Sequence, residues 1–190
     1  VKGFPDDVYL PTGRNVGKIE YVHGGVARNV VEDIANLELR PTFVSTIDTT
    51  SMGKDVVEKL ARHKVNVDYV KAVPEGMGTW LAIFDQNGDL AGSISQRADT
   101  YLVLPILEQH GDEIFKDCDS VIFEIDMHKD VVKKIFELAS KYDKKVILVV
   151  NKSENMNNFK NNIGDFYTLG FGEPLPLSAE HGQGRSEEHT

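Results

Sequence analysis

The sequence predicts an α/β fold, in which a parallel sheet is covered by helices and a small separate β-sheet forms a lid. Strand-like segments alternate with amphipathic helical segments along the chain, which is the pattern of βαβ units and of a parallel sheet. A β-hairpin pattern interrupts this alternation near the middle of the chain and predicts the lid. The length of 190 residues, 41% of them hydrophobic, suits one domain with a short appendage.

The first predicted elements are a strand, a helix and a second strand. Residues 16–22 alternate apolar and polar side chains, as a half-exposed strand does, and they are the first strand of the predicted lid. Two glycines, Gly24 and Gly25, end this pattern. Apolar side chains then recur at helical spacing over residues 26–37, and the β-branched residues of 42–47 predict a strand.

A second helix and the hairpin follow. Ser51 is the predicted N-cap of the second helix. Residues 79–95 are the predicted hairpin, because two strand-like segments flank Asn87-Gly88, a dipeptide suited to the positive φ angles of a type I′ turn. The predicted lid therefore consists of residues 16–22 and 79–95.

Helices and strands alternate again in the second half of the chain. Helical patterns cover residues 100–116, a buried strand is predicted at 120–125, an amphipathic helix at 131–142 and a strand at 145–150. After residue 150 Asn, Gly and Pro become frequent and the periodicity ends. The prediction is a domain over residues 1–150 followed by a segment of different character.

Composition excludes several functional classes. The formal net charge is −9 and no run of Lys or Arg is present, so neither nucleic acid nor an anionic membrane is an expected partner. The longest strongly apolar run, 146–150, is far shorter than the roughly 20 residues that cross a bilayer, and no hydrophobic signal segment is expected. One cysteine, Cys118, cannot form an internal disulfide, which predicts a reducing, cytoplasmic location. The histidines lack paired ligand spacing, so no metal site is predicted.

The segment His23-Gly24-Gly25-Val26-Ala27-Arg28-Asn29-Val30 carries the chemical prediction. Two glycines between a strand and a helix let the backbone approach a ligand closely, and the start of the helix offers unpaired N–H donors. Asn29, one turn into the helix, can both donate to and accept from a hydroxyl. The alternative is an ordinary strand-to-helix turn with an exposed Asn29.

This segment, Asp48 to Gly53, the hairpin and Phe123-Glu124 occur in an order that resembles the PfkB family of carbohydrate kinases. The resemblance covers about residues 1–145 and implies the ribokinase-like three-layer α/β fold with a small β lid. The motif Gly-Gly-x-x-Arg-Asn is most similar to the corresponding motif of pseudouridine kinases and related nucleoside kinases. The resemblance implies a sugar or nucleoside substrate with a ribosyl hydroxyl as phosphate acceptor, ATP and Mg²⁺ as cofactors, and a homodimer formed through the lid.

The resemblance also implies four substrate-binding residues. Gly24, Gly25 and Asn29 would contact sugar hydroxyls, and Glu124 would accept a hydrogen bond from another hydroxyl. Strand alternation supports Glu124, because its apolar neighbours face the other side of the predicted strand, near the end where α/β sheets bind ligands. The alternative is that Glu124 is a carboxylate at a solvent-facing strand end.

Two features of the family are missing. Its opening strand, followed by an Asp that binds the sugar, would precede Val1. Its Gly-Ala-Gly-Asp signature, which supplies the catalytic base and the donors that hold the phosphates, does not occur. Because phosphoryl transfer depends on a positioned base, metal and donors, we expect a truncated, inactive kinase domain, with no catalytic residue and no productive ATP binding in this chain.

The C-terminal segment resembles another family. Asn151-Lys152-Ser153-Glu154 resembles the guanine-specificity motif of GTPases, with Glu154 in place of Asp, and residues 165–182 resemble Der (EngA) GTPases, including the Ser178-Ala179 loop that touches guanine. Residues 146–184 are therefore similar to a GTPase fragment, and the predicted second segment spans 151–184. A P-loop-like segment, Gly13 to Ile19, is one residue short and lacks the Ser or Thr that binds Mg²⁺.

The last six residues, 185–190, resemble a translated sequencing adapter. We therefore expect a chimeric reading frame that joins a kinase piece to a GTPase piece near residues 146–150, and the alternative is a kinase with a divergent C-terminus. The leading functional hypothesis is an ATP-dependent sugar or nucleoside kinase fragment. The alternatives are a GTP-binding ribosome-assembly GTPase fragment and a non-catalytic module that binds a nucleoside or sugar.

Overall fold

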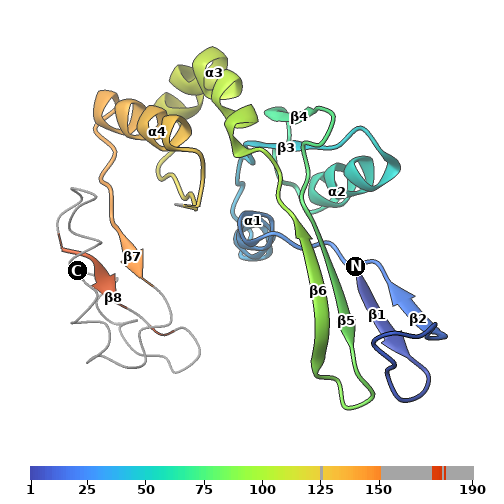
Figure 1. The fold of residues 1–190 in the computed structure, drawn as a ribbon. Coiled ribbons are helices and arrows are strands. Elements are labelled where there is room, and N and C mark those ends of the chain that lie inside the picture. Colours follow the sequence, from blue (N-terminus) through green and yellow to red (C-terminus); the bar gives the residue numbers. More distant parts are fainter. Residues whose placement is uncertain (125, 151–172, 177, 179–190) are drawn as a thin grey trace. The chain divides into compact units, whose positions relative to one another are not determined.

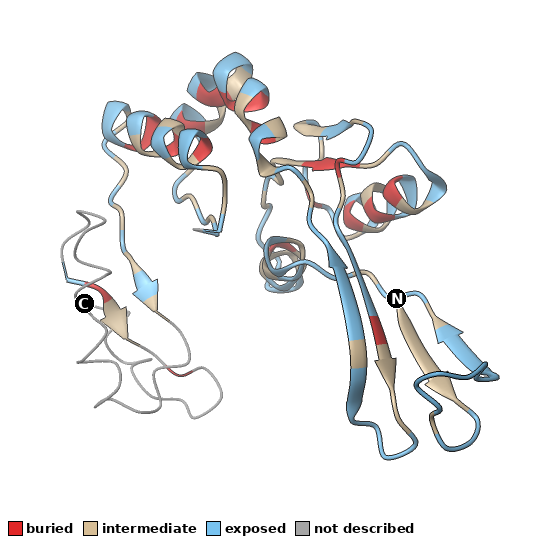
Figure 2. Cartoon of the chain, in the orientation of Figure 1, coloured by how far each residue is buried: buried red, intermediate tan, exposed pale blue. Residues whose placement is uncertain are grey.

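A computed structural model describes residues 1–124, 126–150, 173–176 and 178. The chain divides into two compact units, Val1–Leu138 and Ala139–Thr190, and each is described by itself. The described elements comprise four strands of a mixed sheet, two short parallel strand pairs, and helices that carry most of the buried side chains (Figures 1 and 2).

The lid is a four-stranded sheet with the order β2-β1-β5-β6. Strands β1 (Lys2–Pro5) and β2 (Gly17–Glu20) are antiparallel, as are β5 (Thr79–Phe84) and β6 (Leu90–Gln96), whereas β1 and β5 are parallel. The predicted hairpin is confirmed, but the predicted type I′ turn was wrong, because Gly88 has a positive φ, of 85°, whereas Asn87 does not. Strand β1 was not predicted from the sequence; it joins the two hairpins, and Phe4 stacks on Phe84 with ring centroids 5.1 Å apart.

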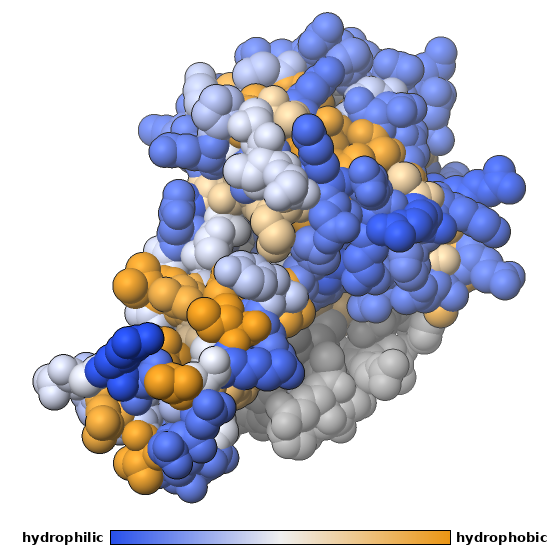
Figure 3. Space-filling model, turned by 90° about the vertical axis from the view of Figure 1, so that its right-hand side faces the viewer, coloured by the Kyte–Doolittle hydropathy of each residue, from blue (hydrophilic) through white to orange (hydrophobic). Residues whose placement is uncertain are grey.

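One face of the lid sheet is apolar and exposed. Leu81 lies opposite Ile94, and both Ile19 and Ile83 lie opposite Gly3, so these side chains share one face. Ile19 is 64% exposed and Ile94 is 70% exposed. Figure 3 shows apolar side chains among hydrophilic ones on the face of the molecule that it presents.

A second group of elements packs around one core cluster. This group consists of the helices α1 (Val26–Asn36) and α2 (Ser51–Arg62) and of two parallel strands, β3 (Ser45–Ile47) and β4 (Val70–Ala72). The helical stripe and the β-branched strand predicted from the sequence supply most of the buried members of this core. Those members are Val31, Ile47, Val56, Leu60 and Val65.

The N-cap of α2 is Thr50, one residue before the predicted Ser51. The Thr50 hydroxyl oxygen accepts a hydrogen bond from the Met52 N–H, at 3.2 Å. Thr50 has the extended backbone of a cap, with φ −81° and ψ 175°, whereas Ser51 is already the first helical residue. The prediction for Ser51 was wrong because two adjacent hydroxyl residues are equally good caps, and the backbone decides between them.

The remaining helices of the first unit follow the predicted pattern. A 3₁₀ turn (η1, Thr100–Val103) leads into α3 (Leu104–Asp117), and α4 spans Lys129–Lys141. Gly111 of α3 permits a close approach, because a β-carbon there would lie 2.5 Å from Cδ1 of Leu138 on α4. No helix in the described ranges is both long enough and apolar enough to cross a membrane.

Two predicted core strands differ from the structure. Residues 120–124 form no strand, and the strand predicted at 145–150 is limited to β7 (Val149–Val150), which pairs in parallel with β8 (Leu175–Pro176). Ile122 is 68% exposed and Ile147 is 57% exposed. An apolar run needs hydrogen-bonding neighbours before it becomes a sheet strand. In the described residues the predicted parallel sheet consists of the pairs β3-β4 and β7-β8.

Candidate functional site

The turn from His23 to Gly25 leads into helix α1 and has an open side. Gly25 is the N-cap residue and has a φ of 95°, which favours glycine. A β-carbon on Gly24 would meet no atom within 4 Å, so packing in the described structure does not require glycine there. No described side chain caps the helix, and its first turn has no acidic residue. The amide groups at the start of α1 are therefore available to hydrogen-bond acceptors.

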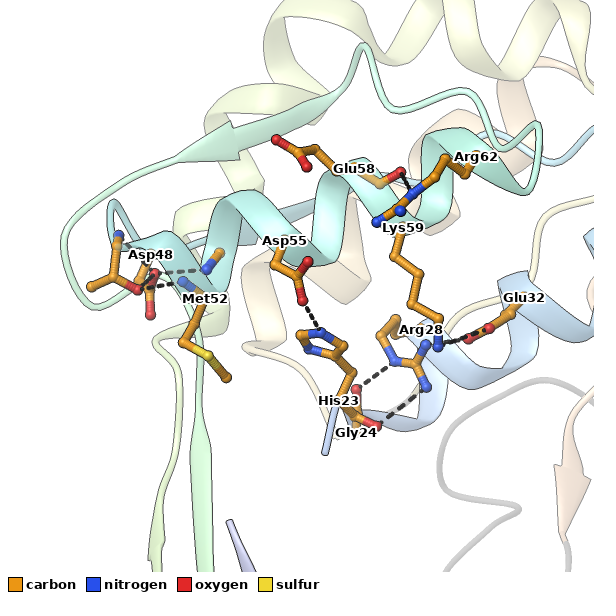
Figure 4. A network of polar contacts seen from close by, with 12 residues as sticks. His23, Gly24, Arg28, Glu32, Asp48, Met52, Asp55, Glu58, Lys59 and Arg62 are labelled. Atoms are coloured by element: carbon orange, nitrogen blue, oxygen red, sulfur yellow. Dashed lines mark hydrogen bonds and ion pairs between the residues drawn. The ribbon is translucent and has the colours of Figure 1, made fainter. Parts of the chain in front are cut away.

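Arg28 holds this turn through hydrogen bonds to its backbone carbonyl groups (Figure 4). Its Nε donates to the carbonyl oxygen of Gly24 at 2.9 Å, and its Nη2 donates to the carbonyl oxygen of His23 at 3.4 Å. Nη2 also donates to the amide oxygen of Asn29, and Nη1 pairs with Glu32. The Arg28 side chain is only 11% exposed, so one guanidinium fixes both the turn and the adjacent amide.

Glu32 connects Arg28 to helix α2. Its second carboxylate oxygen lies 3.1 Å from the Lys59 ammonium and 3.9 Å from Nε2 of His63. The hydrogen bond from Arg28, followed by that from Lys59, lowers the pKa of Glu32 below its usual value. Glu32 is therefore ionised at neutral pH and carries the charge that keeps Arg28 in place.

Asp48 stabilises the start of α2. Its Oδ1 accepts hydrogen bonds from the Thr50 hydroxyl at 2.6 Å, the Thr50 N–H at 2.9 Å and the Gly53 N–H at 3.2 Å. The hydroxyl of Thr50 is the main reason why the pKa of Asp48 is lowered. Gly53 is required by this arrangement, because a β-carbon there would lie 2.4 Å from the Asp48 carbonyl oxygen. The Asp48 to Gly53 motif is thus a helix-start structure.

The structure brings together three of the four predicted substrate-binding residues. Gly24 and Gly25 form the turn, and Asn29 lies one helical turn further along α1. Glu124 is exposed and lies in a segment without strand structure, so the predicted strand-end position was wrong. The reason is that the alternation around Glu124 finds no sheet partner. Among the described residues no hydrogen bond or ion pair joins Glu124 to Asn29.

The predicted guanine-motif residues are mostly outside the described residues. Asn151, Lys152, Glu154 and Ala179 cannot be placed, whereas Ser178 is described and is fully buried.

The P-loop-like segment of the sequence does not have the structure of a P-loop. The segment from Gly13 to Ile19 enters β2, an antiparallel lid strand, whereas a P-loop leads into a helix whose amides bind phosphate. Within the described ranges, no group of three or more His, Cys, Asp or Glu side chains is placed to hold a metal ion.

Sequence analysis missed Arg28, Glu32 and the contacts of His23. The spacing of Arg28 and Glu32, four residues apart on a helix, is a local signal that could have identified their pairing. The contact of His23 with Asp55 joins residues 32 positions apart, and no local pattern reports it.

Comparisons with known proteins identify the family. The family description "pfkB family carbohydrate kinase" matches residues 3–165. Guanosine-inosine kinase of Exiguobacterium acetylicum is 32% identical over 131 residues, which are 68% of this chain and 43% of that kinase. GTPase Der of Thermosipho melanesiensis is 47% identical over 68 residues, which are 34% of this chain and 16% of that GTPase. The chain thus spans less than half the length of these curated relatives.

Solved structures support the predicted fold class. Arabidopsis thaliana ribokinase complexed with ribose and ATP aligns with a TM-score of 0.69 at 16% identity, over 93% of this chain and 68% of that chain. A carbohydrate kinase from Agrobacterium tumefaciens aligns with a TM-score of 0.68 at 17% identity, over 86% of this chain and 54% of that chain. These likenesses confirm the ribokinase-like α/β fold class. Since the family match covers most of the sequence, the chain belongs to the pfkB family of carbohydrate kinases.

Proposed function

We propose that this chain provides the acceptor-binding part of a nucleoside kinase, with Gly24, Gly25 and Asn29 at the hydroxyls of a ribosyl group. The observation that carries the proposal is the open glycine turn at the uncapped start of α1. Gly25 has a φ of 95°, and a side chain on Gly24 would point into open space. This geometry leaves room for a sugar next to backbone donors.

The chemistry of the turn matches a polyol better than an anion or an apolar ligand. Main-chain N–H groups donate hydrogen bonds, and the Asn29 side chain adds a neutral amide within one helical turn. Ribosyl hydroxyls have the lone pairs that such donors require. Gly24, Gly25 and Asn29 carry no charge, so the hydrogen bonds that they offer are neutral.

Two classes of base are candidates. The wording of the Gly-Gly-x-x-Arg-Asn segment favours pseudouridine. The relative named guanosine-inosine kinase, 32% identical to this chain, favours a purine nucleoside. We propose recognition through the ribosyl group in both cases, and a comparison of ligands decides which base is preferred.

Binding is tested by isothermal titration of the 190-residue chain with inosine, guanosine, pseudouridine and ribose. Replacing Asn29 by Ala removes one hydrogen-bonding partner, which weakens binding roughly tenfold. Asn36→Ala is the matched control, since Asn36 is an exposed residue at the other end of the same helix. Equal affinities for the wild type and Asn29→Ala, or no heat with any of the four ligands, contradict the proposal.

We also propose that this chain alone does not transfer phosphate. The support is that the sequence contains no Gly-x-Gly-Asp, the signature that supplies the catalytic base in the family that this chain resembles. ADP formation with ATP and each nucleoside should equal that of a buffer control. Turnover that disappears in Asn29→Ala would show that the chain is a complete kinase.

A second candidate function is GTP binding, favoured by the 47% identity to GTPase Der. The lid position of Gly13 to Lys18 opposes it, because these residues enter an antiparallel strand. Titration with fluorescent mant-GDP separates the two candidates. Saturable binding of mant-GDP that inosine does not displace would favour the GTPase alternative.

A homodimer through the lid is a further part of the proposal. Its support is the exposed apolar face that includes Ile19, Leu81 and Ile94. Analytical ultracentrifugation should show a dimer that Ile94→Lys dissociates. Ser95→Lys, on the opposite face of the same strand, is the control and should leave the dimer intact.

A further inference from the structure

We propose that Arg28 is the positioning residue of the site, which turns the Asn29 amide so that its NH₂ group faces the ligand. The inference rests on the proposed function and adds to it a requirement on the ligand. The ligand atom that meets Asn29 must be a hydrogen-bond acceptor, such as the oxygen of a ribosyl hydroxyl.

The orientation of the Asn29 amide follows from the chemistry of arginine. A guanidinium group has five N–H donors and no acceptor. The Asn29 atom that contacts Nη2 of Arg28 must therefore be its oxygen, since two donors would repel each other. With the oxygen engaged by Arg28, the Nδ2 atom of Asn29 is the side-chain atom that remains available to a ligand.

The same guanidinium fixes the backbone of the turn. Nε and Nη2 donate to the carbonyl oxygens of Gly24 and His23, the two residues before the N-cap. These two hydrogen bonds hold both carbonyl groups toward Arg28. The guanidinium of Arg28 thus orients both the Asn29 side-chain amide and the backbone of the glycine turn.

Anchoring from α2 makes Arg28 rigid enough for this task. The side chains of Arg28 and Glu32 are 11% and 17% exposed, and Glu32 also pairs with Lys59 of α2 at 3.1 Å. Figure 4 shows the Arg28, Glu32 and Lys59 side chains converging between the two helices. A lysine at position 28 would keep the charge but would replace the planar fork by a single ammonium with three N–H donors, which cannot serve the same four acceptors.

Asn29→Asp is the sharpest variant. Aspartate has the shape of asparagine and still accepts from Arg28, but its carboxylate offers no donor to a ligand. We expect affinity for the nucleoside that binds wild type best to fall at least tenfold, while the thermal unfolding midpoint does not fall. Wild-type affinity in Asn29→Asp would overturn the inference and leave the proposed nucleoside binding intact.

Arg28→Lys tests the positioning itself, with Arg40→Lys as the matched control at an exposed arginine outside the turn. In ¹⁵N-labelled protein without ligand, the Asn29 side-chain NH₂ resonances should shift in Arg28→Lys and stay unchanged in Arg40→Lys. Nucleoside affinity should fall about tenfold in Arg28→Lys alone. Unchanged Asn29 resonances in a folded Arg28→Lys protein overturn the positioning role, and lack of nucleoside binding by the wild type overturns the proposed function together with this inference.

Discussion

The Nε2 atom of His23 lies 2.6 Å from Oδ2 of Asp55 and thereby ties the glycine turn to helix α2. The His23 side chain is 17% exposed and that of Asp55 is 54% exposed. Together with the ion pair between Lys59 and Glu32, this contact gives the segment from His23 to Glu32 two attachments to α2. The candidate site is therefore supported by a helix that contributes no predicted ligand-binding residue.

Removing the Asp55 charge should weaken this attachment modestly. We expect Asp55→Asn to lower the free energy of unfolding by about 0.2–1 kcal/mol, because the pair is partly exposed to solvent. Urea titration at neutral pH measures the difference. Asp33→Asn, an exposed acidic residue of α1, is the control and should change stability less. A larger loss of unfolding free energy in Asp33→Asn than in Asp55→Asn would show that the contact of Asp55 with His23 does not stabilise the fold.

The ion pair of Glu32 should make stability depend on pH in the acid range. Because Arg28 and Lys59 lower the pKa of Glu32 in the folded chain, its contribution is complete above the unfolded-state pKa, roughly 4.3. The contribution is lost as the pH falls through the lower folded-state pKa. Wild type should therefore be more stable than Glu32→Gln at pH 7, and the gap should shrink toward pH 3. Urea midpoints at several pH values measure it, and a gap independent of pH would contradict this account.

The two hydroxyl residues at the start of α2 should behave differently. Thr50→Ala removes the cap that accepts from the Met52 N–H and the donor to Asp48, and should cost about 1 kcal/mol or more of unfolding free energy. Ser51→Ala removes a hydroxyl that does not cap the helix and should be nearly neutral. Thermal or urea unfolding of both variants tests the assignment. Equal losses would mean that the cap is shared.

A junction near residues 146–150 remains our proposal for the C-terminal segment. Similarity to GTPase Der and the adapter-like residues 185–190 favour it, whereas the family match, which extends to residue 165, favours a continuous kinase. Sequencing of the genomic locus across codons 140–190 should show kinase sequence that departs from this chain after the junction. An unbroken match through codon 184 would exclude the chimera.

Local patterns in the sequence determined the elements whose partners lie nearby. The helical spacing over residues 26–37 predicted α1, although Val26 and Leu37 of its predicted apolar stripe are exposed, and Asn87-Gly88 predicted the β5-β6 hairpin. The start of α1 directly after Gly24 and Gly25 was also predicted, because two glycines end the strand pattern and helical spacing begins at Val26. In each case the physical cause, a helical period or a turn conformation, acts within a few residues.

Tertiary structure alone decided which segments found partners and which did not. Strand β1 joined the lid by pairing with β2 and β5, whereas residues 120–124 had strand-like alternation but formed no strand. The contact of Lys59 with Glu32 likewise depends on how α1 lies against α2. Strand pairs and ion pairs form between residues that are far apart in the sequence, and local sequence patterns do not show which of these residues come into contact. The sequence determined the residues of the glycine turn, whereas the packing of α1 with α2 determined the contacts of His23 with Asp55 and of Glu32 with Lys59, which join residues far apart in the sequence.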